Sequence, residues 1–120
     1  MLESLISETR DYTATPEDLE LLEFFESDPI ESVPSDGYWC YEFTDKNGVG
    51  IRLSCSALAK SVQTVLLVNG SEIETVVHEG AEEMKIENDA LRCSFALDQL
   101  TQLEIKVRPD ITVQWSSLRT

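Results

Sequence analysis

The spacing of apolar residues changes near Tyr38, and the change divides the chain into two parts. Before this point the apolar residues recur at helical spacing. After it they alternate with polar residues, as in strands that are buried on one face. The alternation predicts about eight short strands, at residues 38–45, 50–56, 61–68, 71–78, 84–87, 90–97 and 103–108 and in a last segment that contains Ile111, Val113 and Trp115.

Tight turns join most of the predicted strands. The turn sequences are Lys46-Asn47-Gly48, Asn69-Gly70 and Asn88-Asp89, and Asn-Gly between apolar runs is a strong signal of a β-hairpin. Because short turns can join only antiparallel strands, the sequence predicts an α+β fold that is mainly antiparallel β, as a sheet or a sandwich. A second sheet or the predicted N-terminal helix must then cover the apolar face. A length of 120 residues indicates a single domain, with an acidic helical front at 1–36 and a β-rich body at 37–120.

The alternation also assigns side chains to the two faces of the strands. Trp39, Tyr41 and Phe43 share the face that is expected to lie in the core, whereas Tyr38 and Cys40 fall on the other face. The same rule places further residues inward, namely Ile51, Leu53, Cys55, Leu91, Cys93, Phe95, Leu97, Leu103, Ile105 and Val107.

A helix is predicted from Thr15 to about Ser27. Thr15 can cap it, Pro16 suits its first position, and Pro29 disfavours its continuation. Its broad apolar face contains Leu19, Leu21, Leu22, Phe24 and Phe25, with Glu20 and Glu23 opposite. The other segments are predicted to be a loop at residues 28–37, a helical turn at residues 57–60, and a short helix or an edge strand at residues 2–11.

Acidic residues are concentrated in the front of the chain. Residues 1–36 contain 11 Asp or Glu and one basic residue, Arg10, whereas residues 37–120 contain 12 Asp or Glu and 8 Lys or Arg. The net charges of the two parts are therefore −10 and −4. A field of this sign attracts a basic protein and repels nucleic-acid backbones and anionic membranes, so neither of the latter is expected as a partner.

The acids of the predicted helix and of the following loop are the candidate partner-binding residues, together with one tyrosine. The set is Glu17, Asp18, Glu20, Glu23, Glu26, Asp28, Glu31, Asp36 and Tyr38. Tyrosine is included because it is enriched at protein interfaces. Reversing Glu20, Glu23 and Glu26 to lysine is expected to leave the fold intact, since all three fall on the predicted solvent face. The alternative interpretation of the acids is a solvated face that keeps the protein soluble.

No catalytic or metal-binding site is predicted, and no cofactor is expected. His78 is the single histidine, and a metal site or a hydrolytic triad needs more partners than Glu74, which falls on the same strand face. Cys55 and Cys93 are in phase with apolar residues, as small core side chains are. A nucleophilic cysteine would need a nearby base or a helix N-terminus, and the sequence offers neither.

Cysteine usage and the first residues indicate a reducing compartment. The three cysteines are odd in number and widely spaced, unlike a disulfide framework. The chain starts without a basic segment or a long apolar run, so no signal peptide is expected. The sequence predicts a cytoplasmic protein, with a monomer favoured.

Several segments resemble the small acidic immunity proteins of bacterial contact-dependent and polymorphic toxin systems. They are the acidic helix and the segments G-Y-W-C-Y-E-F-T-D-K-N-G-V-G-I-R-L-S-C-S, S-V-Q-T-V-L-L-V-N-G and L-E-I-K-V-R-P-D-I-T-V-Q-W-S-S-L. The resemblance implies a non-enzymatic protein that binds a cognate basic toxin domain and blocks it, often by covering a nuclease active site. It implies no catalytic residues.

Two other functions remain open at this point. An acidic secretion chaperone would dimerise through helices and end in a long amphipathic helix, whereas residues 98–120 are predicted to form strands. A small enzyme, or an accessory domain of one, would need an acid–base arrangement, although carboxylates alone can provide such chemistry.

Overall fold

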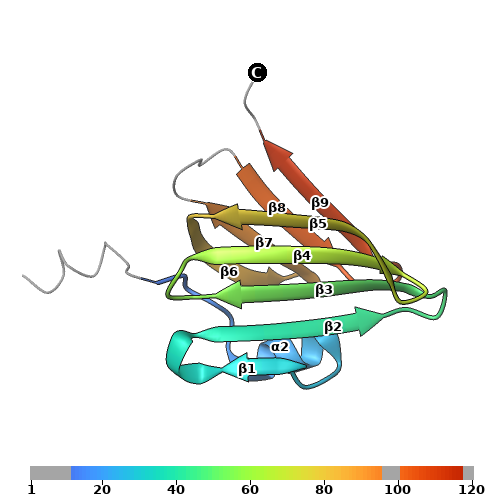
Figure 1. Cartoon of the computed structure of the whole chain (residues 1–120), viewed down its shortest axis with the longest axis horizontal. Coiled ribbons are helices and arrows are strands. Elements are labelled where there is room, and N and C mark those ends of the chain that lie inside the picture. Colours follow the sequence, from blue (N-terminus) through green and yellow to red (C-terminus); the bar gives the residue numbers. More distant parts are fainter. Residues whose placement is uncertain (1–11, 96–100, 118–120) are drawn as a thin grey trace, which may run out of the picture.

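The computed structural model describes residues 12–95 and 101–117, which form two antiparallel sheets and one α-helix (Figure 1). The first sheet has the strand order β1-β2-β3-β4-β5 and the second has the order β6-β7-β8-β9. Within each sheet, the strands are paired in the order in which they occur in the sequence. The predicted α+β fold, mainly antiparallel β, is therefore confirmed, and it takes the form of a sandwich.

The helix α2 spans Asp18–Phe25, and a 3-10 helix spans Pro34–Asp36. The first sheet consists of β1 (Glu31–Val33), β2 (Tyr38–Thr44), β3 (Val49–Ser56), β4 (Ser61–Val68) and β5 (Ser71–Glu79). The second sheet consists of β6 (Ala81–Glu87), β7 (Ala90–Phe95), β8 (Thr101–Lys106) and β9 (Thr112–Ser117). The described residues thus contain nine strands instead of about eight, because β1 lies in the segment that was predicted to be a loop.

The hairpin turns form as their residue types predict. Asn69 and Gly70 both have positive φ, at 51° and 85°, which is the conformation of a type I′ turn. Asn88 and Asp89 also have positive φ, at 52° and 62°. Each turn sets the pairing of the residues next to it, and the register shifts once in each hairpin, between Leu66 and Leu67 in β4–β5 and between Ala81 and Glu83 in β6–β7.

The core lies between the two sheets. Its buried members include Tyr41, Ile51, Leu53, Cys55, Val62, Met84, Leu91, Cys93, Phe95, Leu103, Ile105 and Val107. Trp39 and Phe43 are partly buried and pack against this cluster, which confirms their predicted face. A hydrogen bond of 3.2 Å from Trp115 Nε1 to Thr64 Oγ1 also ties β9 to β4 across the sandwich. Leu97 and residues 2–11 lie outside the described residues.

Helix α2 lies beside β1 and β2 at one edge of the sandwich (Figure 1). It buries Leu21, Phe24 and Phe25, and the ring of Phe25 stacks on Tyr41 with centroids 5.1 Å apart. The predicted apolar face was too broad, because Leu19 is 65% exposed and Leu22 is 38% exposed. A helix that covers only an edge buries a narrower stripe than one that lies across a sheet.

The start of the helix was also predicted wrongly. Its N-cap is Glu17, which has extended dihedrals, and Thr15 and Pro16 precede the helix. Ala14, just before them, pairs with Glu83 of β6, and its backbone bonds hold this segment extended. The helix ends at Phe25, two residues before the predicted Ser27, and its C-cap Glu26 has a φ of 59°. Residues 57–60, which were predicted to form a helical turn, form a hydrogen-bonded turn.

Arg108, which follows β8, holds the C-terminal end of α2. Its guanidinium donates hydrogen bonds to the carbonyl oxygens of Glu23 and Phe24, at 3.0 and 2.7 Å, and pairs with the Glu26 carboxylate at 3.0 Å. A cation at this end complements the negative pole of the helix dipole. The segment after β8 therefore contacts the C-terminal end of the helix through this side chain, in addition to the core packing of Phe24 and Phe25.

Candidate partner-binding site

The segment from residue 17 to residue 36 forms an acidic end of the molecule beside β2 (Figure 1). It carries eight exposed candidate residues, namely Glu17, Asp18, Glu20, Glu23, Glu26, Asp28, Glu31 and Asp36. The segment itself contains no lysine or arginine. The structure thus brings the predicted acids together on one end, which we call the acidic end.

Four of these acids have structural roles within the acidic end, and two of them, Glu17 and Glu20, form the capping box of α2. Glu20 Oε1 accepts a hydrogen bond of 2.9 Å from the backbone N–H of Glu17, as in a capping box. Glu26 pairs with Arg108, and Glu31 accepts a hydrogen bond of 2.9 Å from the Tyr38 hydroxyl. Reversing Glu20, Glu23 and Glu26 together would therefore disturb both ends of α2, contrary to the sequence-based expectation. Glu23 is the member of that trio whose carboxylate is free of such bonds among the described residues.

The first sheet continues the acidic surface, which the sequence analysis did not find. Strands β1–β5 contain five glutamates and one basic residue, Arg52, whereas β6–β9 contain four glutamates against Lys85, Arg92 and Lys106. Arg52 lies between Glu42 and Glu72 and forms ion pairs of 3.1 Å with each, so its charge is already neutralised. A count along the chain misses this asymmetry, because it appears only when the strands are sorted by sheet.

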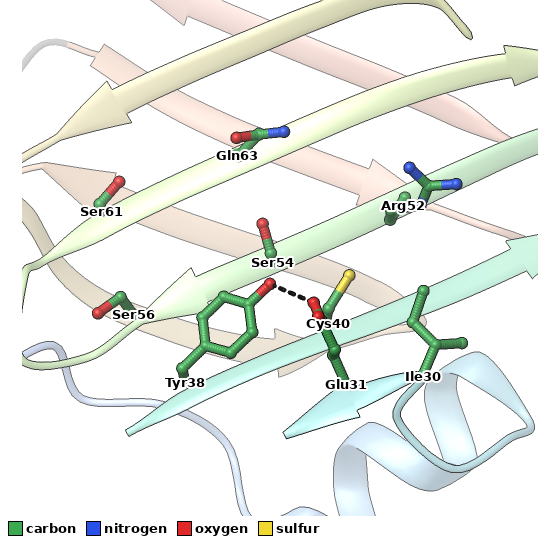
Figure 2. Close-up of a pocket in the computed structure, with 9 residues that line it drawn as sticks. All are labelled: Ile30, Glu31, Tyr38, Cys40, Arg52, Ser54, Ser56, Ser61 and Gln63. Carbon is green, nitrogen blue, oxygen red and sulfur yellow. Dashed lines mark hydrogen bonds between the residues drawn. The ribbon is translucent and has the colours of Figure 1, made fainter. Parts of the chain in front are cut away.

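A hollow of about 400 Å³ lies on the outer face of the first sheet (Figure 2). We call it the serine hollow; its lining is Ile30, Glu31, Tyr38, Cys40, Arg52, Ser54, Ser56, Ser61 and Gln63. The small serine side chains of β3 and β4 leave the space open, and Tyr38 and Glu31 lie on the β1 side of it (Figure 2). Hydroxyl, amide and carboxylate groups here can donate and accept hydrogen bonds to a partner.

Tyr38 lies at the boundary between the serine hollow and the acidic end. Burial of its ring and the hydrogen bond that it donates to Glu31 raise the pKa of Tyr38 to about 12. The hydroxyl therefore stays protonated at neutral pH and holds Glu31 in place. Cys40 falls on the outer face, as predicted, and lies buried at the base of this hollow, where burial raises the pKa of its thiol.

A second hollow, of about 440 Å³, lies between α2 and the strands β1 and β2. We call it the aromatic hollow, since the side chains of Trp39 and Tyr41 line it together with Tyr38. Asp18 of α2 and Asp28 of the following loop contribute the carboxylates of its lining. Tyr38 lines both hollows, so they are neighbours on the two sides of β1.

His78 is part of an aromatic cluster and has no carboxylate partner among the described residues. Its ring centroid lies 4.5 Å from that of Phe95 and 5.9 Å from that of Trp115. Within the described part of the chain, no three His, Cys, Asp or Glu side chains are grouped closely enough to hold a metal ion. No helix in that part is long and apolar enough to cross a membrane.

Cys55 and Cys93 are buried in the core, one from each sheet, and are free thiols. Burial raises the pKa of both thiols to about 12. A thiol in this environment stays protonated and is a poor nucleophile. The two side chains therefore act as small core residues, as their phase in the sequence predicted.

We expect the free energy of unfolding to fall as the pH rises above about 8.5, the usual thiol pKa. The unfolded chain ionises Cys55 and Cys93 from that pH, while the folded chain keeps both protons up to about 12. The stabilisation is thus complete below pH 8.5 and is lost at up to about 1.4 kcal/mol per pH unit for each thiol. Urea unfolding between pH 7 and pH 10 measures the slope, and a Cys55→Ala, Cys93→Ala variant with an equally steep slope would refute this cause.

The fold defines the chain as an antiparallel β-sandwich with one helix at its edge. We compared it with known proteins. No family model matches the chain, and no curated protein matches it in sequence. Among solved structures, the chain is similar to one chain of the "Contact-dependent growth inhibition toxin - immunity protein complex from Klebsiella pneumoniae 342". The TM-score is 0.78 and the identity is 25%, over 88% of this chain and 97% of that chain. The resemblance drawn from the sequence is thereby confirmed at the level of the fold.

Proposed function

We propose that this chain is an immunity protein, which binds a cognate toxin domain and neutralises it without catalysing a reaction. The similarity in fold to a chain of a contact-dependent growth inhibition complex supports this function. The chain covers nearly the whole of that neighbour, at 97%, so the likeness is not limited to a shared hairpin or half-sandwich. An immunity protein works by occupying its partner, and a folded sandwich with hollowed surfaces suits that role.

The partner that fits best is a basic toxin domain, and a nuclease is the natural candidate. A nuclease binds a polyanion through a positive groove, and the acidic end presents the opposite charge to such a groove. The acidic end and the outer face of the first sheet together form the proposed docking surface. The observation that carries this proposal is the placement of eight exposed carboxylates in residues 17–36 on one end of the fold.

Co-expression tests the function directly. The toxin domain encoded beside this chain's gene should stop growth of a bacterial host, and this chain should restore growth when both are made in the cytoplasm. The purified pair should form a complex, and one equivalent of this chain should abolish the toxin's nuclease activity. Growth arrest that persists despite soluble, folded immunity protein would refute the proposal, as would the absence of a complex in calorimetry.

The secretion-chaperone alternative has less support from the fold. Such a chaperone would end in a long amphipathic helix, whereas Thr112–Ser117 forms the strand β9. The proposed immunity protein acts as a cytoplasmic monomer, and size-exclusion chromatography with light scattering tests its oligomeric state. A mass of about twice 13.5 kDa would contradict the monomer.

A further inference from the structure

The aromatic hollow combines two aromatic rings of β2 with two acidic residues from α2 and the loop after it. Trp39 is half-buried and packs edge-on against Tyr41, with ring centroids 5.4 Å apart, so both rings are rigidly placed. The carboxylates of Asp18 and Asp28 come from the opposite wall, which is formed by α2 and the loop after it. A volume of about 440 Å³ lies within the range of roughly 300–1,000 Å³ that is usual for ligand pockets.

The two carboxylates lack a cationic partner in the part of the chain that the structure describes. The ion pairs there join Arg52, Lys85, Arg92 and Arg108 to other acids, and none includes Asp18 or Asp28. Both carboxylates lie near enough to Tyr41 for their charges to raise the pKa of its hydroxyl, after the larger effect of burial. The two negative charges therefore act on the same aromatic wall.

We propose that the aromatic hollow binds an arginine side chain of the toxin, and this proposal rests on the proposed immunity function. A guanidinium is planar, so it can stack on the indole of Trp39 while its N–H groups reach Asp18 and Asp28. The bound arginine would act as an anchor residue of the interface, since buried arginine and aromatic contacts contribute most of the binding energy in many complexes. The other acids of the acidic end then steer the encounter.

Arginine fits this site better than lysine for reasons of shape and hydration. Lysine carries a compact, strongly hydrated charge that cannot stack, whereas the guanidinium is weakly hydrated and carries five donors in one plane. The exposed Leu22 at the rim, which also lines the hollow, adds an apolar surface for the methylene stem. A neutral side chain would leave two carboxylates desolvated and unpaired, which is unfavourable.

The first test uses the complex with the cognate toxin. The Asp18→Asn, Asp28→Asn variant should dissociate at least about tenfold faster, because contacts at a desolvated charged anchor act on dissociation. The matched control is Asp36→Asn, Asp110→Asn, which removes the same charge from residues that do not line the hollow. The control should change mainly the association rate. Equal dissociation rates for the two variants would overturn the proposal and leave the immunity function standing.

The second test needs no toxin. N-acetyl-arginine amide, titrated into the labelled full chain, should shift the indole N–H resonance of Trp39 saturably at millimolar concentration. Trp115, the other of the two tryptophans, donates its N–H to Thr64 and serves as the internal control. N-acetyl-lysine amide should give a smaller shift and N-acetyl-glutamine amide none.

The two tests separate this proposal from the proposed function. If the toxin does not bind the wild-type chain, the immunity function fails, and the arginine titration alone decides on the hollow. A Trp39 shift that disappears in the Asp18→Asn, Asp28→Asn variant supports the site. A shift that is equal for arginine and glutamine amides, or unchanged in the variant, overturns it. Thermal unfolding of each variant confirms that the fold is retained.

Discussion

Replacing Phe25 by alanine is expected to lower the free energy of unfolding by about 3–5 kcal/mol, the usual cost of removing a buried phenylalanine. Phe25 is 1% exposed, stacks on Tyr41 and packs edge-on against Phe24 at 5.0 Å. Its removal would leave a cavity where α2 closes the edge of the sandwich, and the two sheets cannot collapse into it without moving the helix. Urea unfolding at pH 7 measures the loss.

Leu19→Ala is the matched control for Phe25→Ala. Leu19 belongs to the same helix but is 65% exposed, so its truncation should change the free energy of unfolding by no more than about 0.5 kcal/mol. If Phe25→Ala lowers the free energy of unfolding by as little as Leu19→Ala does, the helix is not part of the core that unfolds cooperatively. In that case, the acidic end would be attached more loosely than its contacts indicate.

The strands were the most predictable part of this chain. Leu103, Ile105 and Val107 alternate with polar residues, which predicts a strand that is buried on one face. The structure buries all three side chains. Asn69-Gly70 likewise predicts a hairpin turn, because both residues readily take positive φ. Local patterns of this kind are enough to predict a hairpin.

The errors lie where tertiary contacts decide the outcome. Thr15 is a good helix cap by residue type, but the pairing of Ala14 with β6 keeps the chain extended there. Leu19 and Leu22 have the spacing of core residues, yet the helix meets only an edge. The strand β1 has no apolar alternation of its own and exists because it pairs with β2.

The candidate site was predictable in composition and not in shape. The concentration of acids near α2 is visible in the sequence, and so is the outward position of Tyr38 and Cys40. The two hollows are not, because each joins residues from separated segments. Ser54 and Ser61 leave space in the serine hollow only because β3 and β4 lie side by side. Asp18 and Asp28 face one aromatic wall only because α2 packs beside β2.

Reversing Glu23 and Asp36 to lysine is expected to slow association with the cognate toxin by about tenfold at low salt. Both carboxylates are exposed members of the acidic end, and neither caps a helix, pairs with Arg108 nor lines the aromatic hollow. Long-range attraction between opposite fields raises association rates by about 10–1,000-fold. Two reversals remove four units of charge difference from that field, while dissociation should change little, since exposed rim charges contribute little to it.

The measurement is association kinetics across a salt series, because added salt screens the field and should bring the variant and the wild type together. The matched control is Glu74→Lys, Glu79→Lys on β5, the opposite edge of the first sheet from β1, with the same change in charge. If the toxin docks at the acidic end, the control should slow association clearly less, since the charges that it changes lie farther from the bound partner. If the two variants slow association equally and have the same salt slope, the whole molecule steers the toxin by its net charge of −14. If only the β5 variant slows it, the toxin docks at that edge and the acidic end is a solubilising surface.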